Sequence, residues 1–189
     1  MDNLFKKYSE IRNAIRHIIA NDQILMKLLY YNVDDPLSKE DISIGHIENT
    51  HFFMDARAYN NLDDNGETIV DKEKVVLMFN WEVNDMKKSD MFTITIQPIV
   101  LISNELIEIQ HDEGFNRMTA ILERLNYLFL TNNGTTKEDG EYNISSIGDI
   151  ECISMFRTIN TPFTFIGNYA VYKIIVYGNN RVTDVKYGV

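Results

Sequence analysis

The chain is poor in cysteine and lacks any repeat or low-complexity tract. Cys152 is the only cysteine among 189 residues, so no disulfide can form within the chain. A zinc site built from thiolates of one chain is disfavoured for the same reason. Because Cys152 lies in the apolar stretch 150–153, we expect it to act as a buried small hydrophobic residue rather than a reactive thiol.

Positive charge is also scarce. Eighteen lysines and arginines stand against 28 acidic residues, which gives a net charge of −10. An acidic surface repels phosphate backbones, which disfavours general DNA or RNA binding, and it disfavours docking on anionic membranes. An acidic wall can still face DNA without holding it.

Long apolar runs are missing. No stretch approaches the roughly 18 apolar residues of a membrane span. Residues 1–7 lack the apolar centre of a signal peptide, so we expect a soluble protein made in a cytosol.

Motifs that mark catalysis or cofactor binding are absent too. The sequence has no Gly-x-Ser-x-Gly, no glycine-rich phosphate loop and no His-x-x-x-His pair. Its histidines, His17, His46, His51 and His111, are expected to be exposed or structurally bonded, with the spacing of His46 and His51 a weak metal signal. We therefore expect no enzyme activity, no cofactor and no metal.

Acidic residues cluster in turns. Residues 61–66 imitate the start of a calcium loop, but the twelfth position holds Lys72 where a bidentate glutamate is required, which favours a hairpin turn. The other acidic pairs, Asp34-Asp35, Asp63-Asp64, Asp112-Glu113 and Glu138-Asp139, are expected to be solvated, and catalytic carboxylates would need burial.

Aromatic residues gather near the C-terminus. The group comprises Phe156, Phe163, Phe165, Tyr169, Tyr172 and Tyr177. A stacking platform for nucleic acid needs interleaved cations, and only Arg157, Lys173 and Arg181 are near. A core or a subunit interface is the better interpretation.

Hydrophobic residues make up 44% of the chain, and the spacing of the apolar ones predicts regular elements. Residues 3–19 carry the helical stripe Leu4, Tyr8, Ile11, Ile15, Ile18 and Ile19. A second helix is expected after Asn21 or Asp22, with Ile24, Leu25, Leu28 and Leu29 on its apolar face, and it should end before Pro36. Residues 38–41 resemble the capping start of one more short turn.

Extended structure is predicted further on. Residues 46–59 are predicted to be irregular and then extended, and Asn65-Gly66 suits a hairpin turn. Residues 75–83 and 91–102 are strand candidates, and Pro98 predicts a bulge or an edge position.

A third helix should follow these strands. Its apolar face is Phe115, Met118, Ile121, Leu122, Leu125, Leu128 and Phe129, with Arg117, Glu123, Arg124 and Asn126 mostly off it. Residues 131–143 are predicted to form an exposed loop, and strands are expected near 147–158 and 168–177.

The expected fold class is α+β, a mainly antiparallel sheet with a long amphipathic helix packed on one face and a helical N-terminus. We expect one domain over 1–189: a helical part at 1–45, the sheet with a helix at 113–131 within 46–180, and a flexible tail at 181–189.

This order of elements resembles the neck proteins of tailed bacteriophages, in particular the tail-terminator and tail-completion group. The resemblance covers most of the chain in element order and rests on the segments Ile24–Tyr31, Asp34–Leu37, Arg117–Leu130 and Phe165–Tyr172. It implies an α+β subunit of a homo-oligomeric ring, commonly six-fold, that caps the tail tube and receives the head connector. It implies a place in the virion after assembly in the host cytoplasm, and no catalytic, cofactor or metal residues.

Alternatives remain open at this stage. Another connector, such as a head-completion or tail-tube protein, would follow the same logic, and so would a non-viral small binding module or an enzyme with a cryptic carboxylate site. In a ring, DNA would pass through an acidic lining without specific binding. The acidic loops that we expect to face the channel or a partner contain Asp63, Asp64, Glu138, Asp139 and Glu141.

Overall fold

The computed structural model describes residues 2–59, 74–85, 91–103, 106, 116–131, 149–159 and 165–177. These residues form an α+β fold with three α-helices, three short 3-10 turns and one five-stranded sheet. The helices are α1 (Asp2–Ala20), α2 (Gln23–Tyr30) and α3 (Arg117–Thr131). The strands are β1 (Phe52–Phe53), β2 (Val75–Asp85), β3 (Met91–Ser103), β4 (Asp149–Ile159) and β5 (Phe165–Tyr177).

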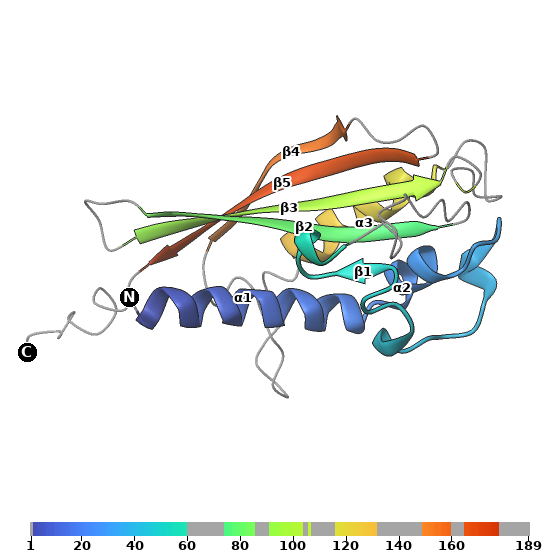
Figure 1. Cartoon of the computed structure of the whole chain (residues 1–189), viewed down its shortest axis with the longest axis horizontal. Coiled ribbons are helices and arrows are strands. Elements are labelled where there is room, and N and C mark those ends of the chain that lie inside the picture. The colour runs from blue at the N-terminus through green and yellow to red at the C-terminus, as the bar shows by residue number, and fades with distance from the viewer. Residues whose placement is uncertain are drawn as a thin grey trace, which may run out of the picture.

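The sheet has the order β1-β2-β3-β5-β4. Strands β2, β3, β5 and β4 pair antiparallel, and β1 adds a short parallel contact to β2 at Leu77 and Met78. In Figure 1, β4 forms the upper edge of the sheet, α3 lies behind the strands, and α1 runs below, beside β1. The expected α+β class with a mainly antiparallel sheet is confirmed.

The main core lies between the sheet and the helices. Alternate residues of β2, β3 and β5 are buried there, in keeping with the two-residue period of a strand. The Phe129 ring of α3 lies 5.0 Å from the Tyr172 ring of β5 and 6.4 Å from Phe79 of β2. The Tyr172 hydroxyl donates to Asn126 Oδ1 at 3.3 Å, which ties the same helix to the sheet.

A smaller apolar cluster lies on the other face of the sheet. Phe53, Val76 and Met78 are buried there, with Tyr59 packed edge-on against Phe53 at 5.3 Å. The two residues of β1 therefore contribute to both faces, because Phe52 joins the main core through Phe79 at 6.0 Å.

Asp22 joins α2 to α3. One of its carboxylate oxygens accepts from Leu25 N at 2.7 Å and so caps α2, as the sequence predicts. The Arg124 guanidinium binds the same carboxylate through Nε at 3.0 and 3.1 Å and through a terminal nitrogen at 2.5 Å. Because the Asp22 side chain is only 8% exposed, this pair is screened little by water.

Four details of the prediction are wrong. Arg117, expected off the apolar face, is fully buried and donates to the carbonyls of Tyr31 (3.0 Å) and Val33. Its burial lowers the pKa of the guanidinium. Ile24, expected on the apolar face of α2, is exposed, since the buried side is completed by Met26.

The other two corrections concern local turns and Pro98. Residues 39–41 form no turn of helix, and the 3-10 turns η1 and η2 occupy Pro36–Ser38 and Ile44–His46, with a third, η3, at Ala56–Ala58. β3 is a central strand, so Pro98 is not at an edge. It pairs with Phe79 of β2, while the register with β5 skips Gln97 and Pro98. Proline lacks an amide hydrogen, so it fits where the ladder on one side is interrupted.

Candidate functional site

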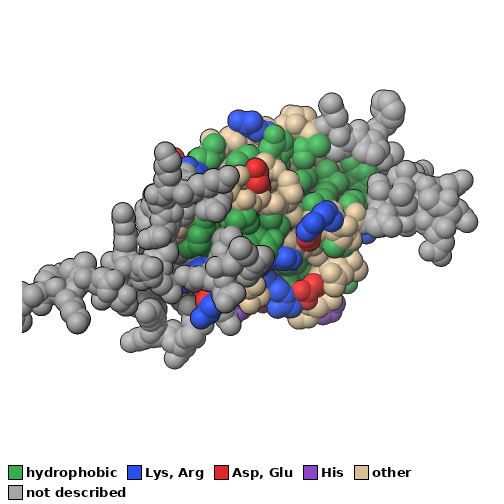
Figure 2. All heavy atoms as spheres, turned by 60° about the vertical axis from the view of Figure 1, so that its left-hand side comes forward, with side chains coloured by type: hydrophobic (Ala, Val, Ile, Leu, Met, Phe, Trp, Pro, Cys, Tyr) green, Lys and Arg blue, Asp and Glu red, His purple; other side chains and the backbone are tan. Residues whose placement is uncertain are grey.

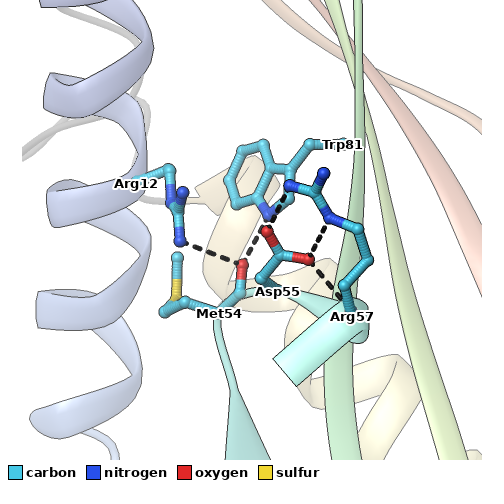
Figure 3. A network of polar contacts seen from close by, with 5 residues as sticks. All are labelled: Arg12, Met54, Asp55, Arg57 and Trp81. Atoms are coloured by element: carbon cyan, nitrogen blue, oxygen red, sulfur yellow. Dashed lines mark hydrogen bonds and ion pairs between the residues drawn. The ribbon is translucent and has the colours of Figure 1, made fainter. Parts of the chain in front are cut away.

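A polar cluster joins α1, β2 and the segment after β1 (Figure 3). The Met54 carbonyl is its centre: it accepts from the Trp81 indole nitrogen at 2.6 Å and from an Arg12 terminal nitrogen at 3.5 Å. The same Arg12 guanidinium lies 5.5 Å from the Tyr8 ring centre and 5.7 Å from that of Trp81. These distances suit cation–π attraction, so the two rings fix the guanidinium in place.

Two ion pairs border this cluster. The Arg57 guanidinium binds Asp55 through two contacts of 3.0 and 2.7 Å, and Arg16 binds Glu48 at 2.6 and 2.7 Å. The hydrogen bond from Arg57 is the main cause that lowers the pKa of Asp55 to about 2, and the charge of Arg12 contributes to the same shift. The hydrogen bond from Arg16 likewise lowers the pKa of Glu48. Both carboxylates are therefore ionised at neutral pH.

An open hollow of about 310 Å³ lies beside the cluster. It is lined by Tyr8, Ser9, Arg12, Asn13, Arg16 and Met54. Five of these six residues come from α1, where positions three and four apart share one face. The hollow thus combines two guanidinium groups, a hydroxyl and an amide with the apolar surfaces of Tyr8 and Met54.

The β4 strand is a second candidate surface. It ends the described sheet, and its only strand neighbour among the described residues is β5. Its register shifts twice between Cys152 and Arg157, and within this bulge Ile153 is 49% exposed and Phe156 42% exposed. Phe156 has a φ of 56°, a left-handed conformation that a bulky side chain rarely adopts. Bulges of this kind re-aim side chains at sheet edges.

Figure 2 shows one face of the molecule with hydrophobic side chains at the surface between charged ones. Scattered exposed apolar residues are normal on a protein surface. Ile153 and Phe156 differ from such scattered apolar residues because they lie three positions apart in one bulged edge strand.

The predicted acidic loop residues Asp63, Asp64, Glu138, Asp139 and Glu141 lie outside the described residues. So do the calcium-like segment 61–72, the tail 181–189 and His111. The prediction that these loops face a channel or a partner therefore stays a prediction.

The described histidines take part in local contacts. His51 Nδ1 lies 2.9 Å from the Val75 carbonyl, His46 Nδ1 lies 2.9 Å from the Ser43 hydroxyl, and His17 Nε2 lies 2.9 Å from the Asn21 amide. Within the part of the chain that the structure describes, no three histidine, cysteine or acidic side chains form a metal-like group. Burial raises the pKa of the Cys152 thiol, which favours the unreactive protonated form.

The aromatic group of the C-terminal strands is divided by the sheet. Tyr172 is fully buried, and its burial raises the pKa of its hydroxyl, whereas Phe156 is exposed on β4. This separation of core and surface positions follows strand alternation and the bulge, so the aromatic residues do not form one stacking platform in the described strands.

Sequence reasoning missed the cluster around Arg12. Arg12 was recognisable only as a cation off the apolar stripe of the first helix, and Met54 contributes a carbonyl, which no side-chain pattern reveals. Arg12 and Met54 are 42 residues apart in the sequence, and they are in contact because the segment after β1 lies beside α1.

In the described residues, no helix is long and apolar enough to cross a membrane. No protein-family model matches the chain, and no curated protein matches it significantly.

Proposed function

We propose that this protein is a structural subunit that joins copies of itself into a ring at the head–tail junction of a tailed bacteriophage. The β4 edge, beside which no further strand lies in the described residues and on which Ile153 and Phe156 are exposed in a bulge, is the observation that carries the proposal. Apolar side chains that project from a sheet edge are typical anchors of a protein interface. A ring forms when such a surface meets a different surface of the next copy at a rotation that closes.

The resemblance to tail-terminator proteins supplies the place and role in this proposal. The ring, with six copies favoured, caps the tail tube and binds the head connector, and the virion neck is its location. The proposal assigns no catalytic step, cofactor or metal. A head-completion or tail-tube role would use the same edge, and the position of the ring in the particle distinguishes these roles.

The acidic character of the chain fits a channel for DNA. A net charge of −10 repels the phosphate backbone, so DNA can pass without adhering. In this proposal the loops containing Asp63, Asp64, Glu138, Asp139 and Glu141 face the channel or a partner. Lysine at these positions should slow DNA delivery or block joining, and fully infectious particles carrying all five lysines would contradict that assignment.

Electron microscopy of the full chain tests the proposal directly. The chain is imaged alone and after mixing with purified tail tubes of the virus whose capsid and tail genes flank its own gene. We expect closed rings around a central channel, either free or at one end of the tubes. Single subunits in both samples, or a gene remote from any capsid and tail genes, would overturn the proposal.

A further inference from the structure

One of the cations that line the hollow on α1 uses few of its hydrogen-bond donors among the described residues. Within the described part of the chain, Arg12 makes one hydrogen bond, at 3.5 Å to the Met54 carbonyl, although a guanidinium carries five N–H donors. Three other described arginines, Arg16, Arg57 and Arg124, each bind a carboxylate through two or more contacts at 3.1 Å or less. Among the described residues, no carboxylate lies within ion-pair distance of Arg12, in a chain that has ten more acids than cations.

The guanidinium is held in advance of any ligand. The rings of Tyr8 and Trp81 lie 5.5 and 5.7 Å from it, and one of its nitrogens makes a long hydrogen bond of 3.5 Å to the Met54 carbonyl. A side chain that is already ordered loses less entropy on binding, so the contact with an anion is stronger than that of a free surface arginine.

The charges around the hollow select the kind of anion. Among the described side chains of the hollow and its two bordering ion pairs, Arg12, Arg16 and Arg57 carry three positive charges and Glu48 and Asp55 carry two negative ones, which leaves one net positive charge. One charge suits a carboxylate, whereas a dianionic phosphate would meet the two ionised carboxylates nearby. The apolar surfaces of Tyr8 and Met54 favour a ligand whose carboxylate is followed by an apolar side chain.

We propose that the hollow formed by Tyr8, Ser9, Arg12, Asn13, Arg16 and Met54 binds an acidic side chain of a partner polypeptide. The partner's carboxylate accepts a forked pair of hydrogen bonds from Arg12, with Asn13 and Ser9 as further donors at the rim. The volume of about 310 Å³ lies at the lower end of the range of ligand sites, which suits a few side chains of a peptide. This site does not depend on ring assembly.

Trp81 provides a specific reporter. It is the only tryptophan in the chain, and its ring lies 5.7 Å from the Arg12 guanidinium, so its fluorescence senses events at this site. The full chain is titrated with the peptide acetyl-Ala-Glu-Leu-amide at constant ionic strength. The matched peptide, acetyl-Ala-Gln-Leu-amide, removes the charge and keeps the shape. We expect a saturable change with the glutamate peptide alone.

Variants assign the binding to Arg12. Arg12→Gln should weaken binding by about tenfold or more, since a charge-assisted hydrogen bond contributes about 1.5–3 kcal/mol. Asn13→Asp places a repelling charge at an exposed rim position without touching the core, so it should weaken binding while the fold stays intact. Arg157→Gln, on distant β4, removes the same charge as a control and should bind like the original chain.

Several outcomes would overturn this site. They are an equal response to the glutamine peptide, an absence of saturation with the original chain, and unchanged binding in both Arg12→Gln and Asn13→Asp. Because the site is built on α1 and needs no contact with β4, a failure of peptide binding leaves the ring proposal untouched, and a chain that never forms rings can still bind the peptide.

Discussion

The two edges of the sheet differ in how they meet solvent. At the β2 edge, β1 pairs with Leu77 and Met78, and α1 contacts Trp81 through Tyr8. The rest of this edge exposes the polar side chains of Asn80, Glu82 and Asn84 together with Val83, which is 41% exposed. At the β4 edge, the described chain provides no further strand, and Ile153 and Phe156 are exposed in a bulge. The β2 edge is therefore partly covered within the subunit and exposes one large apolar side chain, whereas the β4 edge exposes two within one bulge.

In the proposed ring, β4 of one copy contacts a different surface of the next copy, because contacts between two β4 surfaces would pair copies into dimers and would not close a ring. The bulge and the charges of Asp149, Glu151 and Arg157 disfavour simple addition of another strand. We therefore expect side chains, rather than a continued hydrogen-bond ladder, to form the contact.

The largest effect on stability is expected on the covered, helical side. Asp22→Ala removes the cap of α2 and leaves Arg124 without its carboxylate. The cap contributes about 1 kcal/mol and the charge-assisted bonds about 2 kcal/mol, so urea unfolding should show a loss of about 3 kcal/mol. Assembly, measured where the variant is still folded, should change little.

Asp41→Ala is the matched control for this variant. Asp41 pairs with Lys27 at 2.8 Å, but its side chain is 73% exposed, so its removal should cost less than about 1 kcal/mol. Equal losses in the two variants would show that the helical side does not depend on the buried pair.

Substitutions on the β4 edge should show the reverse behaviour, a large effect on association and a small effect on stability. Ile153→Lys combined with Phe156→Asn should weaken association by about a hundredfold, because both anchors are lost. Stability of the single chain should stay within about 0.5 kcal/mol, since both side chains are exposed and asparagine tolerates the φ of residue 156. Sedimentation across a range of concentrations measures association.

Ile24→Lys is the control for the edge variant, because Ile24 is 43% exposed on α2 and lies away from β4. It should assemble like the original chain. If it blocks assembly while the β4 variant assembles normally, the contrast between the two edges fails.

The smallest effect concerns pH on the covered side. The pKa of Asp55 falls from 3.8 to about 2 in the folded chain, so its ion pair stabilises the fold above the unfolded value and loses this contribution as the pH falls through about 4 to 2. The Asp55→Asn variant should therefore be less stable than the original chain at neutral pH, and the difference in stability should shrink as the pH approaches about 2. Urea midpoints at several pH values measure the difference, and a difference that stays constant with pH would show that the Asp55 charge is not its cause.

Helices and strands with a clear period could be predicted from the sequence. The stripe of residues 3–19, the Asp22 cap and the strands near 75–83 and 91–102 all correspond to observed elements within a few residues. These features depend on neighbours along the chain, which the sequence displays directly.

Features set by distant neighbours could not be predicted. Arg117 has the pattern of a surface cation, yet it is buried because the carbonyls of Tyr31 and Val33, more than 80 residues away, accept from it. Pro98 is typical of an edge residue, yet β5 pairs on either side of it. The hollow at Arg12 likewise exists only because β1 brings Met54 to α1.

Hydrogen exchange of the proposed assembly and of the single chain tests most directly whether β4 joins copies of this chain in the proposed ring. We predict that backbone amides of residues 152–157 exchange more slowly in the assembly, while the paired residues of β1 and β2 exchange equally in both forms. Unchanged exchange along β4, together with slowed exchange at the β2 edge alone, would contradict this role of β4.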